Sequence, residues 1–163
     1  MIIFVSVLSF LMDGILSKYI ASTSLFLPLF TIISLIIIYP YFNNNDYRYL
    51  KYVSIMGLLY DIAYMNTVFF NFFIFLILGF IVLFIFYFLT NNYLFNILTS
   101  VICIVIYRII IYLFLVIVKN YSFSFNILFK SIYSSLILNI IYCTIVYLFT
   151  SLYSKKHKIL KSK

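Results

Sequence analysis

The chain of 163 residues contains no glutamate and no tryptophan, and it has only one histidine and three glycines. A metal site of histidine and carboxylate ligands needs several such groups together, yet His157 stands alone in a basic C-terminal stretch. Serine, cysteine or threonine nucleophiles would lack a histidine base within the apolar part of the chain. Three isolated glycines form no phosphate-binding loop. The composition therefore favours a protein that is not an enzyme and that uses no metal or cofactor.

Charged residues are also scarce, and most of the chain is apolar. Hydrophobic residues make up 67% of the chain and charged residues 9%, with a mean hydropathy of +1.23. Soluble domains have about 45–50% and about 25%. A soluble fold of this size could not cover so much apolar surface. We expect an all-α polytopic membrane protein, in which Cys103 and Cys143 are buried packing residues rather than a disulfide or reactive thiols.

Polar clusters divide the chain into six apolar segments, each close to the ~17–25 residues that one crossing needs. The predicted spans of this single domain, 1–163, are 1–20, 25–42, 50–65, 68–89, 94–118 and 131–153, with a basic tail over 154–163. Pro28 is expected in the first turn of the second span, where a missing N–H does little harm. Four or five spans would result if the first or the third were re-entrant.

Basic residues predict how the spans are oriented. With six spans both termini share one side, and seven basic residues fall on that side: Arg48, Lys51, Lys155, Lys156, Lys158, Lys161 and Lys163. Three fall opposite: Lys18, Lys119 and Lys130. Because cytoplasmic loops carry the excess of lysine and arginine, both termini are expected in the cytoplasm. The net charge of +8 is then mostly a topology signal, and no motif supports nucleic-acid binding.

Polar and small residues inside two spans follow helical spacing. The first span carries Ser6, Ser9, Asp13 and Ser17, and the third carries Ser54, Gly57, Asp61 and Met65. Positions i, i+3 and i+7 share one face of a helix. Such faces turn toward other helices in lipid, where close approach and hydrogen bonding are available. We therefore expect the first and third spans to line the bundle interior.

Three charged residues fall well inside spans, away from the span ends, where an unpaired charge costs at least ~2.5 kcal/mol. At 1.5 Å per residue, Asp13, Asp61 and Arg108 lie roughly 18, 16 and 21 Å from the inner ends of their spans. We predict a cluster in which Arg108 is the counter-ion of one acid and the first, third and fifth spans are tied together. Asn139, in the middle of the last span, is expected to hydrogen-bond a neighbouring helix. The residues around the two aspartates do not resemble an intramembrane aspartyl protease.

One stretch is specific enough to suggest a family. Gly57-Leu58-Leu59-Tyr60-Asp61-Ile62-Ala63-Tyr64, followed by an apolar run to Gly79, resembles the signature of the rod shape-determining membrane protein MreD family. The length, the six apolar spans and Asn139 are similar to that family as well. Family members often carry glycine four residues before Gly57 and eight after Asp61, and proline shortly before the last-span asparagine. This chain has Val53, Phe69 and Ser134 there.

The resemblance implies a non-enzymatic component of the bacterial cell-elongation complex in the cytoplasmic membrane. Its expected partners are the bitopic protein MreC and, through the complex, MreB, RodA and a penicillin-binding transpeptidase. Gly57, Tyr60, Asp61 and Tyr64 would shape the surface offered to a partner's span or hold the bundle together. The alternative is a vitamin-binding membrane subunit of an energy-coupling-factor transporter, which six helices and a polar interior also fit.

Overall fold

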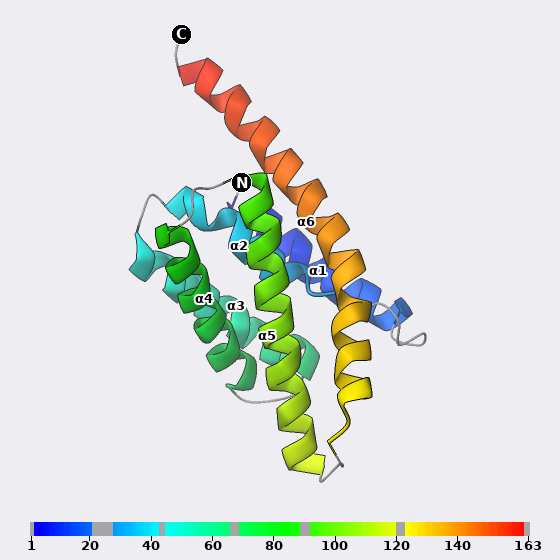
Figure 1. Cartoon of the computed structure of the whole chain (residues 1–163). Helices are drawn as coiled ribbons and strands as arrows, with labels where there is room; N and C mark the ends of the chain where they lie inside the picture. The colour runs from blue at the N-terminus through cyan, green and yellow to red at the C-terminus, as the bar shows by residue number, and fades with distance from the viewer. Residues whose placement is uncertain are drawn as a thin grey trace.

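The computed structural model describes residues 2–20, 28–42, 45–65, 69–88, 92–119 and 123–161, and in these residues the chain is helical and has no strand (Figure 1). The elements, in chain order, are α1 (Ile2–Ile20), α2 (Phe30–Ile38) with the 3₁₀ turn η2 (Tyr39–Phe42), α3 (Asp46–Tyr60) with the π-helical turn η3 (Asp61–Met65), α4 (Phe70–Phe88), α5 (Tyr93–Lys119) and α6 (Phe125–Lys161). The all-α prediction is confirmed for this part of the chain.

Three of the helices are long and apolar enough to cross a membrane. These segments are Phe70–Phe88, Tyr93–Val118 and Phe125–Tyr153. At 1.5 Å per residue even the shortest approaches the ~30 Å hydrocarbon core of a bilayer. Helices α5 and α6 pack side by side along the molecule (Figure 1). By length and composition, the described helices are compatible with an all-α membrane protein.

Helix α2 is the short element and lies at the centre of the molecule. All of its nine residues are buried, and it packs against α1, α4, α5 and α6. Nine residues rise about 14 Å, roughly half of a hydrocarbon core. The helix begins at Phe30, so Pro28 precedes it instead of standing in its first turn. Residues 25–27 of the predicted span lie outside the described residues.

Other helix ends also differ from the predicted spans. Helix α3 begins at Asp46, four residues before the predicted start, because the Asn45 side chain accepts the backbone N–H of Arg48 at 3.1 Å and caps the helix. Helix α6 begins at Phe125 and runs to Lys161, through parts of the predicted loop and tail. No glycine or proline interrupts residues 123–163. Helices α4 and α5 begin and end within two residues of their predicted spans.

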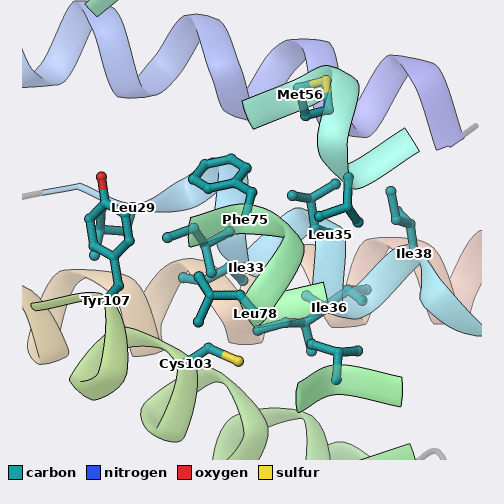
Figure 2. Close-up of a cluster of buried hydrophobic side chains, with 14 of the residues drawn as sticks. Leu29, Ile33, Leu35, Ile36, Ile38, Met56, Phe75, Leu78, Cys103 and Tyr107 are labelled. Atoms are coloured by element: carbon teal, nitrogen blue, oxygen red, sulfur yellow. The ribbon is translucent and has the colours of Figure 1, made fainter. Parts of the chain in front are cut away.

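The apolar core forms around α2. Ile33 and Ile36 of α2 meet Phe75 and Leu78 of α4 in Figure 2, with side chains of α3 and α5 beside them. Cys103, also in this cluster, and Cys143 of α6 are fully buried, free thiols, as the sequence predicted. The outward faces remain apolar, because lipid and not water is the solvent expected around them. On α6 alone the exposed residues include Phe129, Tyr133, Ile141, Ile145 and Leu152.

Candidate functional site

Asp13 binds the N-terminus of α2. Its Oδ1 accepts the backbone N–H of Phe30 at 2.7 Å, and its Oδ2 accepts the N–H and the hydroxyl of Thr31 at 2.9 and 2.6 Å. The first N–H groups of a helix have no partner within the helix, and the helix dipole favours negative charge there. Asp13 is 2% exposed. A carboxylate from α1 therefore caps a helix that begins inside the protein.

Asn139 completes the same cap from α6. Its Oδ1 accepts the N–H of Leu29 at 2.8 Å, and its Nδ2 donates to the carbonyl of Ser135 at 2.6 Å. Asn139 is fully buried, and its expected hydrogen bond to another helix is present. Three successive backbone donors at the start of α2, from Leu29 to Thr31, thus find acceptors on two other helices. This arrangement removes the cost of burying them unpaired.

Asp61 caps the N-terminus of α4 in the same way. Its Oδ1 accepts the backbone N–H and the side-chain Nδ2 of Asn71 at 2.9 and 3.0 Å, and its Oδ2 accepts the N–H of Phe72 at 3.1 Å. Helix α4 begins at Phe70, so these donors belong to its first turn. Asp61 is 1% exposed, and its carboxylate lies in the interface between α3 and α4. Asp13 and Asp61, the two acids predicted inside spans, are thus helix caps supplied from a neighbouring helix.

The position of Gly57, four residues before Asp61, has a structural reason. A Cβ atom at Gly57 would lie 2.8 Å from the backbone oxygen of Asn71 and 2.9 Å from the Cα of Phe72. Positions i and i+4 share a helix face, so Gly57 and Asp61 meet the same turn of α4. The glycine lets the backbone of α4 approach, and the aspartate binds the N–H groups brought within reach.

Tyr60 and Tyr64 occupy a different face of the same segment and contact α1. The Tyr64 hydroxyl donates to the carbonyl of Phe10 at 2.5 Å, and the Tyr64 ring covers Gly14, where a Cβ would lie 2.6 Å from ring atoms. The Tyr60 ring stands edge-on to Phe10 at 6.3 Å and to Tyr64 at 4.9 Å. Together, these two tyrosines with Gly57 and Asp61 hold α3 against both α4 and α1.

Helix α5 joins these caps through adjacent residues. The Tyr107 hydroxyl donates to Oδ1 of Asn71 at 3.2 Å, and Nε of Arg108 donates to the Ser135 hydroxyl at 3.2 Å. Arg108 is 9% exposed and interacts electrostatically with Asp13. The predicted cluster of Asp13, Asp61 and Arg108, with Arg108 as the counter-ion of one acid, stays a prediction. The hydrogen bonds, with the backbone between Tyr107 and Arg108, link all six helices.

The polar stripe predicted on α1 faces the interior. Ser6 hydrogen-bonds the Tyr52 hydroxyl of α3, and Ser9 contacts the Tyr142 hydroxyl of α6 at 2.7 Å. Ser17 instead bonds its own helix, at the Gly14 carbonyl. In the third span Ser54 likewise donates to its own helix, and the Met65 side chain lies outside the described residues.

Sequence reasoning missed Thr31, Asn71, Tyr107 and Ser135. Asn71 offered a signal, because it is an amide within an otherwise apolar run, and polar residues in such runs seek partners on other helices. Tyr107 offered none, since tyrosine is common throughout this chain. Among the described residues no group of three or more histidine, cysteine or acidic side chains could hold a metal ion.

These contacts define a class: an all-α protein with helices able to cross a membrane, whose buried polar side chains fasten the ends of neighbouring helices. No protein-family model, no curated protein and no solved structure matches the chain.

Proposed function

We propose that this protein is a non-enzymatic scaffold of the bacterial cell-elongation complex, a multi-pass protein of the cytoplasmic membrane with both termini in the cytoplasm. Its direct partner is an MreC-like bitopic protein, and MreB, RodA and a penicillin-binding transpeptidase complete the assembly. The function is cell-shape maintenance during lateral peptidoglycan synthesis. The proposal rests on the resemblance of the Gly57–Tyr64 segment to the MreD signature and on how that segment is used.

One observation carries the proposal. Each of Gly57, Tyr60, Asp61 and Tyr64 contacts another helix of the same chain, and the two acids of the interior accept backbone N–H groups. Such a segment fixes the relative positions of α1, α3 and α4, which gives the bundle a defined outer surface. A defined surface is what a scaffold offers to the span of a partner. The motif would then act on the partner indirectly, through the shape of the bundle.

Two family positions add support. Phe69 has a φ of +64°, a left-handed conformation that favours glycine, at the position where MreD proteins often carry glycine. Val53 replaces another such glycine, and it packs against Gly79 of α4, where an added Cβ would lie 3.3 Å from its Cγ1. A small residue on α4 thus accommodates the larger residue on α3.

The transporter-subunit alternative has less support. A cavity between α2, α3, α4 and α5 has a volume of about 10 Å³ and is lined mainly by apolar side chains, among them Ile36, Phe75 and Val82. Pockets for small molecules typically measure about 300–1,000 Å³. This cavity has room for about one water molecule, not for a vitamin.

The experiment is co-purification from membranes of the tagged full chain with the MreC-like protein of the same organism. We expect the wild type to recover the partner, and Gly57→Leu and Asp61→Ala to recover it at least fivefold less. Ile77→Leu, a change on the outward face of α4, is the matched control and should behave as wild type. Monodisperse elution, together with protected Cys103 and Cys143, shows which variants are folded.

Failure of the wild type to recover the partner would overturn the proposal. Full recovery by folded Gly57→Leu and Asp61→Ala would remove the role of the motif. The same preparation is also heated with each of a panel of vitamins. A rise in melting temperature with one of them would favour the transporter-subunit alternative over the scaffold.

A further inference from the structure

Two basic segments that are far apart in the sequence lie at the same end of the bundle. The Tyr41 hydroxyl of η2 donates to the Thr150 carbonyl of α6 at 3.2 Å, so η2, the element before α3, lies beside the C-terminal part of α6. Arg48 and Lys51, in the first two turns of α3, are exposed. Lys155, Lys156 and Lys158 follow Thr150 by five to eight residues on α6. We call these five residues the basic collar.

The helix geometry sets the height of the collar. Helix α6 continues without a break from its apolar part, which ends at Tyr153, through Lys161, and its last turns extend beyond the other helices in Figure 1. At 1.5 Å per residue the three lysines of the collar lie about 3–8 Å beyond Tyr153 along the axis. That distance is within one Debye length, ~8 Å at physiological salt, of the end of the apolar surface.

Exposed tyrosines mark the membrane boundary at this end. Tyr47 of α3 and Tyr87 of α4 are 77% and 84% exposed, and Tyr93, whose hydroxyl pairs with Thr144 of α6 at 3.1 Å, is also exposed. Tyrosine is enriched at the level of lipid headgroups, where its ring is apolar and its hydroxyl is hydrated. On α6 the apolar surface is followed by the three lysines, in the order in which a bilayer passes from hydrocarbon to phosphate. The exposed tyrosines of α3, α4 and α5 lie at the same end.

We propose that the basic collar binds the headgroups of anionic phospholipids. Lysine ammonium groups and the Arg48 guanidinium are donors that suit phosphate oxygens, and clustered cations just beyond an apolar span are attracted to anionic leaflets. The acid of this end, Asp46, accepts the Tyr39 hydroxyl at 3.2 Å and offsets one of the five positive charges. The inference does not depend on the proposed scaffold function.

The test compares two variants of the full chain with equal loss of charge. In the collar variant Lys155, Lys156 and Lys158 are changed to glutamine, and in the control variant Lys18, Lys119 and Lys130 are changed to glutamine. Each is purified in detergent with equal amounts of phosphatidylglycerol and phosphatidylcholine, and retained lipids are counted by native mass spectrometry. Because each lysine near an anionic surface contributes on the order of fivefold in partition, the collar variant should lose at least tenfold of the wild-type preference for phosphatidylglycerol.

The control variant should keep that preference within twofold. Equal preference in both variants, or a loss in the control alone, would overturn the proposal. Excess inorganic phosphate should displace little lipid if the site is at the membrane surface; complete displacement would show that the collar recognises free phosphate and not a headgroup. Both variants must keep the wild-type thermal stability, so that a change in lipid preference does not reflect a loss of folding.

Discussion

Helices α1 and α3 use the same device in different surroundings. Each carries an aspartate that binds the first N–H groups of the helix that follows it, and in each a valine and a serine precede the aspartate by eight and seven residues. The α2 helix that Asp13 caps is buried along all of its nine residues, whereas the α4 helix that Asp61 caps has 19 residues and an exposed face.

The surroundings decide what else each cap requires. At the start of α2 a third backbone donor is buried, and Asn139 of α6 supplies the additional acceptor. At the start of α4, Asp61 alone accepts the backbone N–H groups of Asn71 and Phe72. Gly57 allows the close approach of the α3 and α4 backbones that these bonds require. The comparison shows that an acid inside an oily chain can be structural, because helix ends inside a membrane protein need acceptors that water cannot provide.

The largest effect is expected at Asp13, because its loss leaves the most deeply buried donors unpaired. Asp13→Ala removes the acceptor of Phe30 N–H, Thr31 N–H and the Thr31 hydroxyl, and each unpaired buried group costs about 1–3 kcal/mol. We expect the free energy of unfolding to fall by about 3–5 kcal/mol. The measurement is the reaction of Cys103 and Cys143, both fully buried, with a thiol-reactive fluorophore during heating in detergent.

Asp61→Ala is the matched change and should lower the free energy of unfolding by about 2–4 kcal/mol, since Phe72 N–H is only partly buried. Asp→Asn at either position keeps one acceptor oxygen and should cost about half as much. An order in which Asp61→Ala is the more severe change would refute the ranking by burial.

The next effect concerns the close backbone approach between α3 and α4 at Gly57. Gly57→Ala would place a Cβ 2.8 Å from backbone, which has to move, whereas at Gly79 the nearest atom is a Leu50 side-chain carbon at 3.1 Å. Overpacking typically costs about 1–3 kcal/mol, so we expect about 2–3 kcal/mol for Gly57→Ala and less than 1 kcal/mol for Gly79→Ala. Thermal unfolding of the two variants side by side checks this, and equal melting temperatures would contradict it.

A smaller loss is expected at Asn139, the second cap of α2. Asn139→Ala leaves Leu29 N–H without its acceptor, and interhelical hydrogen bonds in membranes contribute on average about 0.6 kcal/mol, at most about 1.7 kcal/mol. A fall of about 1–2 kcal/mol in the free energy of unfolding is expected. In the double variant Asp13→Ala/Asn139→Ala, the loss of unfolding free energy should differ from the sum of the two single losses by at least about 0.5 kcal/mol. The reason is that the two side chains bind adjacent backbone donors. Simple additivity would show that the two caps act independently.

The helical class and the inward polar faces could be predicted from the sequence because they depend on composition and on spacing along one helix. Asp13 and Asp61 could be singled out from the sequence, but their partners could not. Those partners are backbone N–H groups of other helices, and backbone donors carry no sequence signature. For the same reason the short α2 was predicted as a full span: its apolar run begins at Leu25, before Phe30, where the helix starts with Asp13 and Asn139 as its caps.

The smallest effect, and the one of opposite sign, is expected at Phe69, directly before the helix that Asp61 caps. A non-glycine residue with a φ of +64° stores about 1–3 kcal/mol of strain, and the Phe69 ring is 51% exposed and edge-on to Phe72 at 5.9 Å. Glycine would relieve the strain and lose that ring contact, so Phe69→Gly should raise the free energy of unfolding by about 0.5–1 kcal/mol. Phe73→Gly, at an exposed position inside α4, should lower it by about 1 kcal/mol. A melting temperature that falls for Phe69→Gly as it does for Phe73→Gly would show that the left-handed turn before α4 is not strained.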